Sequence, residues 1–208
     1  MIYVPEMFAE RHDARLYDVI QRNPFATIVT PNASDPWVSH LPFLLDRERR
    51  VLRAHMARAN PHWRALESGA DSLVIFQGPH HYVSPGWYGH HPSVPTWNYA
   101  AVHVQGRPCI LHDRKSLEDL LADLVADSER GSKSWTMKLP REYFNKMLEA
   151  IVGFEVPVST VIGKFKLSQN RPPDDHPRVI AALQAAGSDS AREVAQLMQE
   201  RLRNLPAE

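Results

Sequence analysis

Side chains that can bind a ligand or take part in catalysis are concentrated in four segments of the chain. These segments carry hydroxyls, imidazoles, amides, cations and large aromatic rings. They are VSHLP (38–42), AHMARANPHW (54–63), FQGPHHYVSPGWYGHHPSVPTWNY (76–99) and GKFKLSQNR (163–171). Such residues can bind a metal, attack a carbonyl group or bind a phosphate, and each role requires a different spacing.

The histidines of the third segment suggest a metal site at first sight. They form two adjacent pairs, His80-His81 and His90-His91. Adjacent side chains in a strand point to opposite faces, and structural zinc sites commonly use cysteine or histidines four residues apart. The chain has a single cysteine, Cys109, and no HExxH motif. We therefore expect no metal and interpret these histidines as polar loop residues.

A serine hydrolase and a nucleotide-binding loop are also not supported. Ser39 is adjacent to His40, and Ser84 lies in a loop segment, but neither serine has the context of a nucleophile elbow. Adjacency in sequence is not the geometry of a triad. None of the nine glycines is spaced as in a Rossmann or Walker loop.

A phosphate site is better supported, around Arg58. This arginine follows a predicted strand and precedes a helix predicted to begin at Pro61. That position presents a cation and free backbone N–H groups together, which suits a phosphate. The alternative is a surface arginine that caps a turn.

The stretch VPTWNYAAVHVQG (94–106) has an unusual polar and aromatic start. Residues 101–106 alternate as in a half-buried strand, but Trp97, Asn98 and Tyr99 follow one another directly. Three consecutive strand residues cannot share a face. The aromatic rings are interpreted either as ligand contacts or as core or interface residues, and a buried amide at Asn98 needs several partners.

Short strands with few helices between them carry these segments. The predicted strands are 25–30, 37–45 with an edge or bulge at Pro42, 51–56, 71–78, 94–106 with a continuation to 112, and 151–167 with breaks at Pro157 and Gly163. The predicted helices are 8–22, 61–67, 113–128, 141–149 and the tail from 177, with a capping box at Ser190 and Glu193 and a loop at 131–139. Most connections are too short for parallel crossovers, so we expect an α+β fold with an antiparallel, barrel-like core.

Composition limits the class of protein further. The 208 residues include 24 basic and 24 acidic side chains, which gives no support to phosphate neutralisation on DNA. A single cysteine fits a reducing compartment. We find no signal peptide at the start and no apolar run long enough to span a membrane, and we expect a cytoplasmic protein.

The motifs NPHW, FQGPHHYVSPGWY, VPTWNYAAVHVQG and KLSQNR occur in this order and closely resemble the PaiB-type family of FMN-binding negative transcriptional regulators. The similarity begins at YVP, includes PFATIVT and SHLPFLL, and extends to Arg171. It implies an antiparallel split β-barrel of the FMN-binding type, with peripheral helices and a helical C-terminal tail. It also implies a homodimer with FMN at the subunit interface. We expect a split-barrel domain at residues 1–175 and a helical extension at 176–208 packed on it.

The resemblance assigns ligand contacts by segment. VSHLPFLL corresponds to the strand along the flavin ring, AHMARANP to the phosphate-binding turn, and the WNY stretch to the flavin cleft or the dimer seam. Oxidase relatives place a lysine in that turn, whereas here Ala59 follows Arg58, and Lys164 or Lys166 is the candidate to complete the phosphate site. The predicted cofactor-binding residues are Ser39, His40, Ala54, His55, Arg58, Asn60, Trp97, Asn98, Tyr99, Lys166 and Gln169.

Three functions remain open at the level of sequence. The first is a flavin-binding repressor that responds to flavin or ligand state. The second is an FMN-dependent oxidoreductase related to pyridoxamine-phosphate oxidase, and the third is a haem-binding split barrel. The even charge balance and the lack of a helix-turn-helix argue against direct DNA reading, and no proton donor for catalysis is identified.

Overall fold

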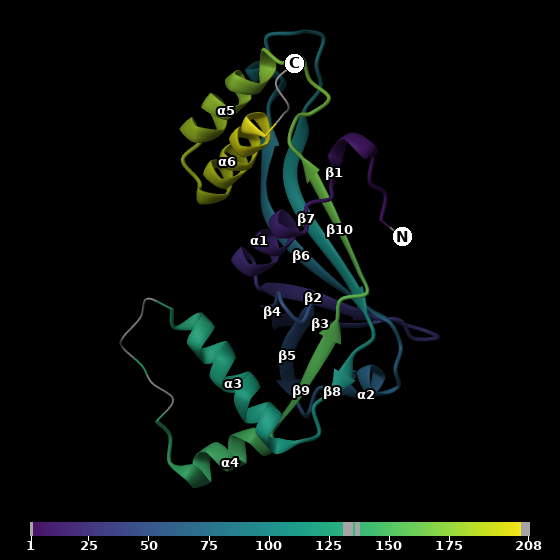
Figure 1. Ribbon diagram of the computed structural model, residues 1–208. Coiled ribbons are helices and arrows are strands. Elements are labelled where there is room, and N and C mark those ends of the chain that lie inside the picture. Colours follow the sequence, from purple (N-terminus) through teal and green to yellow (C-terminus); the bar gives the residue numbers. More distant parts are fainter. Residues whose placement is uncertain (1, 131–134, 136–137, 205–208) are drawn as a thin grey trace. The chain divides into compact units, whose positions relative to one another are not determined.

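The computed structural model describes residues 2–130, 135 and 138–204. The chain forms two compact units, and each unit is built from segments that are far apart in sequence. Unit 1 comprises residues 1–19, 77–102 and 162–208, and unit 2 comprises residues 20–76 and 103–161. Figure 1 labels the helices and strands of both units.

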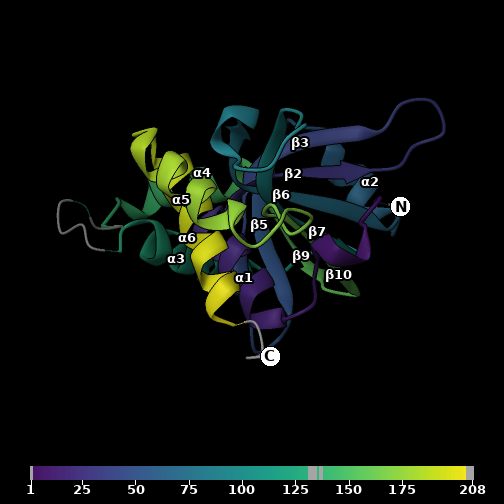
Figure 2. The same ribbon diagram turned by 90° about the horizontal axis from the view of Figure 1, so that it is seen from above.

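Unit 1 combines a set of antiparallel strands with two C-terminal helices. Its strands follow the order β1-β10-β7-β6, and Ala9 of β1 pairs with Lys164 of β10. The helices α5 and α6 lie side by side in both views of the molecule (Figures 1 and 2). The elements with residues in unit 1 are η1 (Glu6–Phe8), β1 (Ala9–Glu10), α1 (Asp13–Arg22), β6 (Ser72–Val83), η2 (Pro85–Trp87), β7 (Thr96–Gly106), β10 (Thr160–Lys166), α5 (Asp175–Ala185) and α6 (Asp189–Arg203).

Unit 2 contains two groups of strands and three further helices. One group has the order β6-β2-β3 and the other the order β4-β5-β9-β8. All strand pairs for which a register is given in this unit are antiparallel. The remaining elements are β2 (Phe25–Thr30), β3 (Trp37–Pro42), β4 (Leu44–Asp46), β5 (Val51–Ala57), α2 (His62–Glu67), β8 (Cys109–Ile110), α3 (Arg114–Ser128), α4 (Arg141–Glu149) and β9 (Ile151–Pro157).

The core of unit 2 follows from alternation along its strands. In β2 the side chains of Ala26, Ile28 and Thr30 are buried, because every second residue of a strand points to the same face. Aromatic rings then fill the interior: Phe43 packs edge-on against both Phe76 and Phe154 at centroid distances of 5.9 and 6.0 Å.

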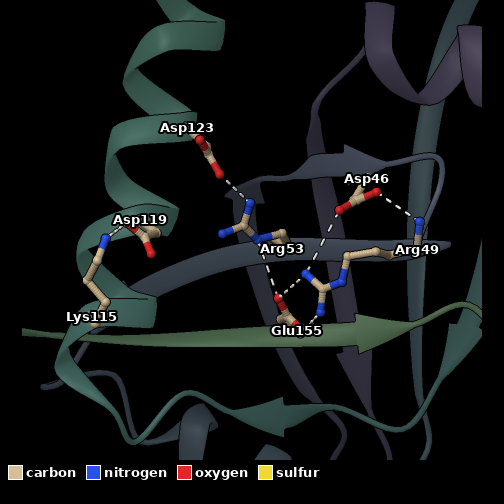
Figure 3. A network of polar contacts seen from close by, with 7 residues as sticks. All are labelled: Asp46, Arg49, Arg53, Lys115, Asp119, Asp123 and Glu155. Atoms are coloured by element: carbon tan, nitrogen blue, oxygen red, sulfur yellow. Dashed lines mark hydrogen bonds and ion pairs between the residues drawn. The ribbon is translucent and has the colours of Figure 1, made fainter.

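An ion-pair network lies beside this core, on β5, β9 and α3 (Figure 3). Glu155 of β9 accepts two hydrogen bonds from Arg49, at 3.0 and 2.8 Å, and lies 3.4 Å from Nε of Arg53. Arg53 also pairs with Asp123 of α3 at 2.5 Å. Arg53 and Glu155 are mostly buried, so their pairing stabilises the contact between β5 and β9 more than an exposed pair would, whereas Asp123 on α3 is 53% exposed.

The predicted class, α+β with antiparallel sheets, is confirmed, and several boundaries agree with prediction. Strand β2 and helix α4 begin and end where the sequence predicts. The predicted strand 37–45 divides into β3 and β4 at Phe43, the residue after Pro42. The predicted loop 131–139 lies largely outside the described residues. Among the described helices, none has both the length and the apolar character that crossing a bilayer requires.

Several local predictions are wrong. The strand predicted at 71–78 continues to Val83, so His80 and His81 lie in β6 and not in a loop. The first helix begins at Asp13 rather than Phe8, because residues 6–10 form a short 3-10 turn and the strand β1. Gly163 does not break β10; a Cβ there would lie 2.1 Å from Cδ2 of Leu16, so the glycine permits close packing within a continuous strand. Ser188, and not Ser190, caps α6 by accepting from the N–H of Ala191.

Candidate functional site

The structure divides the eleven predicted cofactor-binding residues between the two units. Each group is described within its own unit. Unit 2 contains Ser39, His40, Ala54, His55, Arg58 and Asn60, and unit 1 contains Trp97, Asn98, Tyr99, Lys166 and Gln169.

Ser39 and Asn60 belong to a buried chain of hydrogen bonds in unit 2. The Asn60 amide donates to the Ser39 hydroxyl at 3.0 Å, and Ser39 lies 2.8 Å from Nδ1 of His62. Nε2 of His62 lies 2.9 Å from the Thr30 hydroxyl, which lies 2.7 Å from the hydroxyl of Ser72. This chain brings together β3, the turn before α2, β2 and β6.

Both ring nitrogens of His62 bond with hydroxyls of this chain. Nδ1 faces Ser39, which also accepts from the Asn60 amide, and Nε2 faces Thr30. Trp37 stacks on the ring at a centroid distance of 6.0 Å. Burial lowers the pKa of His62, which is 0% exposed, and so favours the neutral imidazole.

His62 was not among the predicted site residues, although it lies in the NPHW motif. The sequence does indicate that a helix begins at Pro61. In the structure, Oδ1 of Asn60 accepts a hydrogen bond from the N–H of His62 at this helix start. What the sequence did not reveal was that the ring bonds with Ser39 and Thr30, which lie 23 and 32 residues away.

Arg58 occupies the turn between β5 and α2, as predicted, but its guanidinium contacts the protein. Nε donates to the carbonyl of Glu149 at 2.8 Å and Nη2 to the carbonyl of Ile151 at 2.9 Å. These carbonyls lie at the end of α4 and the start of β9, so the cation sits at a helix C-terminus, where the helix dipole favours it. Among the described residues, Nη1 of Arg58 has no protein partner.

The other three predicted residues of unit 2 have different environments. His40 is exposed on β3 and its Nδ1 lies 3.0 Å from the hydroxyl of Thr27. Ala54 is fully buried in the core. His55 is half-buried, burial lowers its pKa, and its buried Nδ1 has no hydrogen-bond partner among the described residues. It lines a cavity of about 220 Å³ with Pro42, Leu121, Leu124 and Val125.

In unit 1, the WNY stretch alternates between the two faces of β7. Trp97 is 53% exposed and Tyr99 is half-buried on the same face, whereas Asn98 is fully buried on the other. Trp97 lies 6.2 Å from the ring of His80 and 6.1 Å from that of Tyr82, which is 41% exposed. His80, Tyr82 and Trp97 form an exposed aromatic cluster, which we call the β6–β7 cluster.

Asn98 points into the interior of unit 1, where its amide is only partly satisfied. Its Nδ2 donates to the Ser168 hydroxyl at 2.9 Å and lies 3.5 Å from the sulfur of Met198. Its Oδ1 is buried and accepts no hydrogen bond from the described residues. A buried acceptor left without a donor is uncommon in folded proteins and marks a position to explain.

Lys166 and Gln169 both bond with nearby backbone or side-chain oxygens. Lys166 donates to the hydroxyl of Thr96 and to the carbonyl of Trp97, and burial lowers its pKa. Gln169 bridges the carbonyl of Phe165 at 2.5 Å and the N–H of Leu167 at 2.6 Å. Both residues hold the end of β10 in place.

A buried carboxylate organises the histidine-rich loop of unit 1. Asp175, 0% exposed, accepts from the N–H of Gly89 at 2.7 Å and from Arg171 at 2.7 and 3.0 Å, and lies 3.2 Å from His90. Burial alone would raise the pKa of Asp175, but these hydrogen bonds outweigh it and hold the pKa well below its usual range. The Arg171 guanidinium lies 4.0 Å from the ring centroid of Tyr88. The sequence did not identify Asp175.

Comparison with protein families and curated proteins gives matches over most of the chain. Residues 2–160 match a family model described as "Putative FMN-binding domain". The chain is 35% identical over 205 residues to "Protease synthase and sporulation protein PAI 2" of Bacillus subtilis, covering 97% of this chain and 99% of that protein. It is 32% identical over 244 residues to an uncharacterized protein of Emericella nidulans, covering 96% and 97% of the two chains.

Solved structures with low sequence identity share the fold. The flavocytochrome Anf3 from Azotobacter vinelandii matches with a TM-score of 0.66 at 15% identity, over 84% of this chain and 78% of that one. The FAD and heme binding protein from Mycobacterium smegmatis matches with a TM-score of 0.59 at 17% identity, over 87% and 80%. These similarities confirm the predicted split-barrel fold class, and at such identities they show the fold alone.

Proposed function

Because the chain belongs to the PaiB-type family of FMN-binding proteins, we propose that it is a flavin-dependent negative regulator of transcription. FMN is its cofactor. In this proposal it acts as a cytoplasmic homodimer and represses target genes in response to flavin or ligand state. The observation that carries the proposal is the 35% identity to the Bacillus subtilis protein over 97% of this chain.

Each unit offers residues that fit part of the chemical needs of FMN. A flavin has a planar ring with polar edges and a phosphate, so it needs flat contacts, hydrogen-bond partners and a cation. In unit 1 Trp97 offers an exposed ring, and in unit 2 His55 Nδ1 is a buried polar atom without a partner among the described residues. The remaining predicted residues, including His40, Asn98 and Tyr99, stay predicted FMN contacts, each within its own unit. Bound FMN would supply one- and two-electron redox chemistry.

Among the predicted cofactor-binding residues, Arg58 and Lys166 carry the side chains suited to bind the phosphate of FMN. Lys166 already donates to Thr96 and Trp97, and its pKa is lowered, so it is the less suitable of the two. Arg58 keeps Nη1 available among the described residues, while its two bonds to carbonyls fix the guanidinium plane. We therefore assign the phosphate to Arg58 in this proposal.

The first test measures flavin binding by the purified protein. We expect flavin absorption bands on purification or after addition of FMN. Arg58→Ala should weaken FMN binding by about 1.5–3 kcal/mol, the scale of a charge-assisted hydrogen bond, and leave riboflavin binding nearly unchanged. Arg58→Lys keeps the charge and should recover part of the loss. An equal loss for FMN and riboflavin would instead assign Arg58 to holding α4 and β9.

The second test concerns repression. With 24 basic and 24 acidic residues, the chain offers few phosphate contacts, so we propose that it represses through a partner or a flavin-linked reaction. Binding to promoter and random DNA fragments is titrated against salt. We expect weak, unselective binding by the protein alone. Selective nanomolar binding at physiological salt would overturn this proposal in favour of direct repression. A variant that loses repression but still binds FMN would separate repression from flavin binding.

A further inference from the structure

A cavity of about 310 Å³ in unit 1 is lined by charged side chains that the flavin proposal does not use. Its walls come from η1, β1 and the start of α1, from the end of β10 and the residues after it, and from α6. The residues that matter for its chemistry are Glu10, Arg15, Phe165, Leu167, Gln169 and Arg201.

Arg15 reaches this cavity with only half of its guanidinium engaged. Nη1 forms an ion pair with Glu10 at 2.6 Å, and the guanidinium carbon lies 5.5 Å from the ring centroid of Phe165. Nη2 is buried and has no hydrogen-bond partner among the described residues. A buried donor without an acceptor is costly, and a ligand oxygen would remove that cost.

Arg201 brings a second cation to the same cavity from α6. It is half-buried, and its pKa is lowered by burial and then by the positive charge of Arg15. Two guanidinium groups that repel one another in a cavity are a favourable environment for an anion.

Both glutamates that line the cavity already pair with arginines. Glu10 pairs with Arg15 and accepts from the N–H groups of Arg11 and His12, both at 3.0 Å. Glu6 pairs with Arg11 at 2.7 Å. Of the charged residues that line the cavity, three are arginines and two are glutamates, so one positive charge is left without a matching carboxylate in the lining.

We propose that this cavity binds a small oxyanion, a carboxylate or phosphate group, between Nη2 of Arg15 and the guanidinium of Arg201. Phe165 and Leu167, both nearly fully buried, supply an apolar wall for the remainder of a small organic acid. Gln169, which is also a predicted flavin contact, lines the cavity with an amide that is already bonded to the backbone of Phe165 and Leu167. The site goes beyond flavin binding and does not depend on it.

The test is calorimetric titration of the FMN-saturated protein with inorganic phosphate and with hexanoate. Arg201→Gln should weaken binding about tenfold or more, because it removes one charge-assisted contact. Glu10→Gln keeps the acceptor oxygen but removes the competing charge, so it should tighten binding several-fold. Arg192→Gln is the control, since Arg192 lies on the same helix but pairs with Asp189 and the carbonyl of Gly187.

The proposal is supported if Arg201→Gln weakens anion binding and Glu10→Gln tightens it. The probe that binds more tightly, phosphate or hexanoate, identifies the class of anion. The proposal fails if neither probe binds at millimolar concentration, or if Arg201→Gln binds as the control does. It also fails if phosphate displaces FMN, because the cavity would then be part of the flavin site. Arg15→Lys, which keeps the charge without Nη2, provides a second variant if Arg201→Gln does not fold.

Discussion

At the scale of single residues, the structure explains why the polar motifs are only partly available to a ligand. Ser39 and Asn60 are predicted cofactor contacts, yet Ser39 bonds with the buried ring of His62 and the Asn60 amide donates to Ser39. The sequence singles out these segments because their residue types are unusual for strands and turns. It did not identify the partners, since each partner depends on which strands lie next to one another.

His62 gives the stability of the protein a predictable dependence on pH. Its folded pKa is lowered by burial, so the unfolded chain binds more protons once pH falls below about 6.5. The contribution of His62 is therefore full above that pH and is lost as pH falls. We expect His62→Gln to cost about 1–3 kcal/mol at pH 7.5 and to flatten the decline in unfolding free energy below pH 6.5.

Urea denaturation at a series of pH values measures this effect. Ser39→Ala is the matched control, because it breaks the same hydrogen-bond chain but leaves the buried imidazole in place. It should lower stability at every pH and keep the slope. Burial also lowers the pKa of His55 and His103, so part of the slope remains in His62→Gln. An unchanged slope in that variant would contradict the assignment.

At the scale of elements, sequence patterns located most strands and helices but misjudged packing. Gly163 illustrates this, because glycine in a strand suggests a break, whereas here it accommodates Leu16 of α1. The sequence predicts a cap at Ser190, whereas Ser188 caps α6 in the structure. Ser190 is not the cap because its hydroxyl accepts from the N–H of His80 and donates to the carbonyl of the same residue.

Gly163→Ala tests the close packing of β10 against α1. The added methyl would overlap Leu16 and approach Glu10 at 3.2 Å, so we expect a loss of about 1–3 kcal/mol in unfolding free energy. Gly86→Ala is the control in the same unit, where the nearest atom would lie at 3.5 Å. Thermal denaturation compares the two variants. Equal melting temperatures would mean that Leu16 moves aside without cost.

Glu155→Gln tests the ion-pair network of β5, β9 and α3 (Figure 3). Glutamine keeps the size but loses the charge facing Arg49 and Arg53, so we expect a loss of about 1–2 kcal/mol at low salt. The difference from the unmodified protein should shrink as salt increases, because salt screens the charges. Lys115→Gln removes an exposed pair with Asp119 and should leave the denaturation midpoint unchanged. A loss independent of salt would assign the effect of Glu155→Gln to packing.

At the scale of the whole molecule, the resemblance to a known family predicted more than the residue patterns did. Periodicity indicated only an α+β fold with antiparallel strands, and the motifs added the split barrel and FMN. The dimer stays a prediction. It rests on the resemblance to the family. Not every aromatic residue of the third segment is available to an interface, because Tyr88 is buried within unit 1 beside Arg171.

The β6–β7 cluster is the surface on which a dimer is now best tested. Trp97 and Tyr82 remain exposed, and such aromatic side chains are enriched at subunit interfaces. We expect sedimentation to show a dimer at micromolar concentration and Trp97→Ala to shift it toward monomer. Tyr143→Ala, which removes a similarly exposed ring on α4, should leave the dimer intact. A stable monomer for the unmodified protein would contradict the prediction.

The interleaving of the two units has a consequence for inheritance. The chain passes between them inside α1, β6, β7 and β10, so unit 1 is encoded by three separate stretches of the gene and unit 2 by two. Recombination that exchanged either unit would have to cut within a helix or a strand, and not in an exposed linker where domain boundaries usually fall. No single continuous stretch of the gene therefore encodes one unit without part of the other.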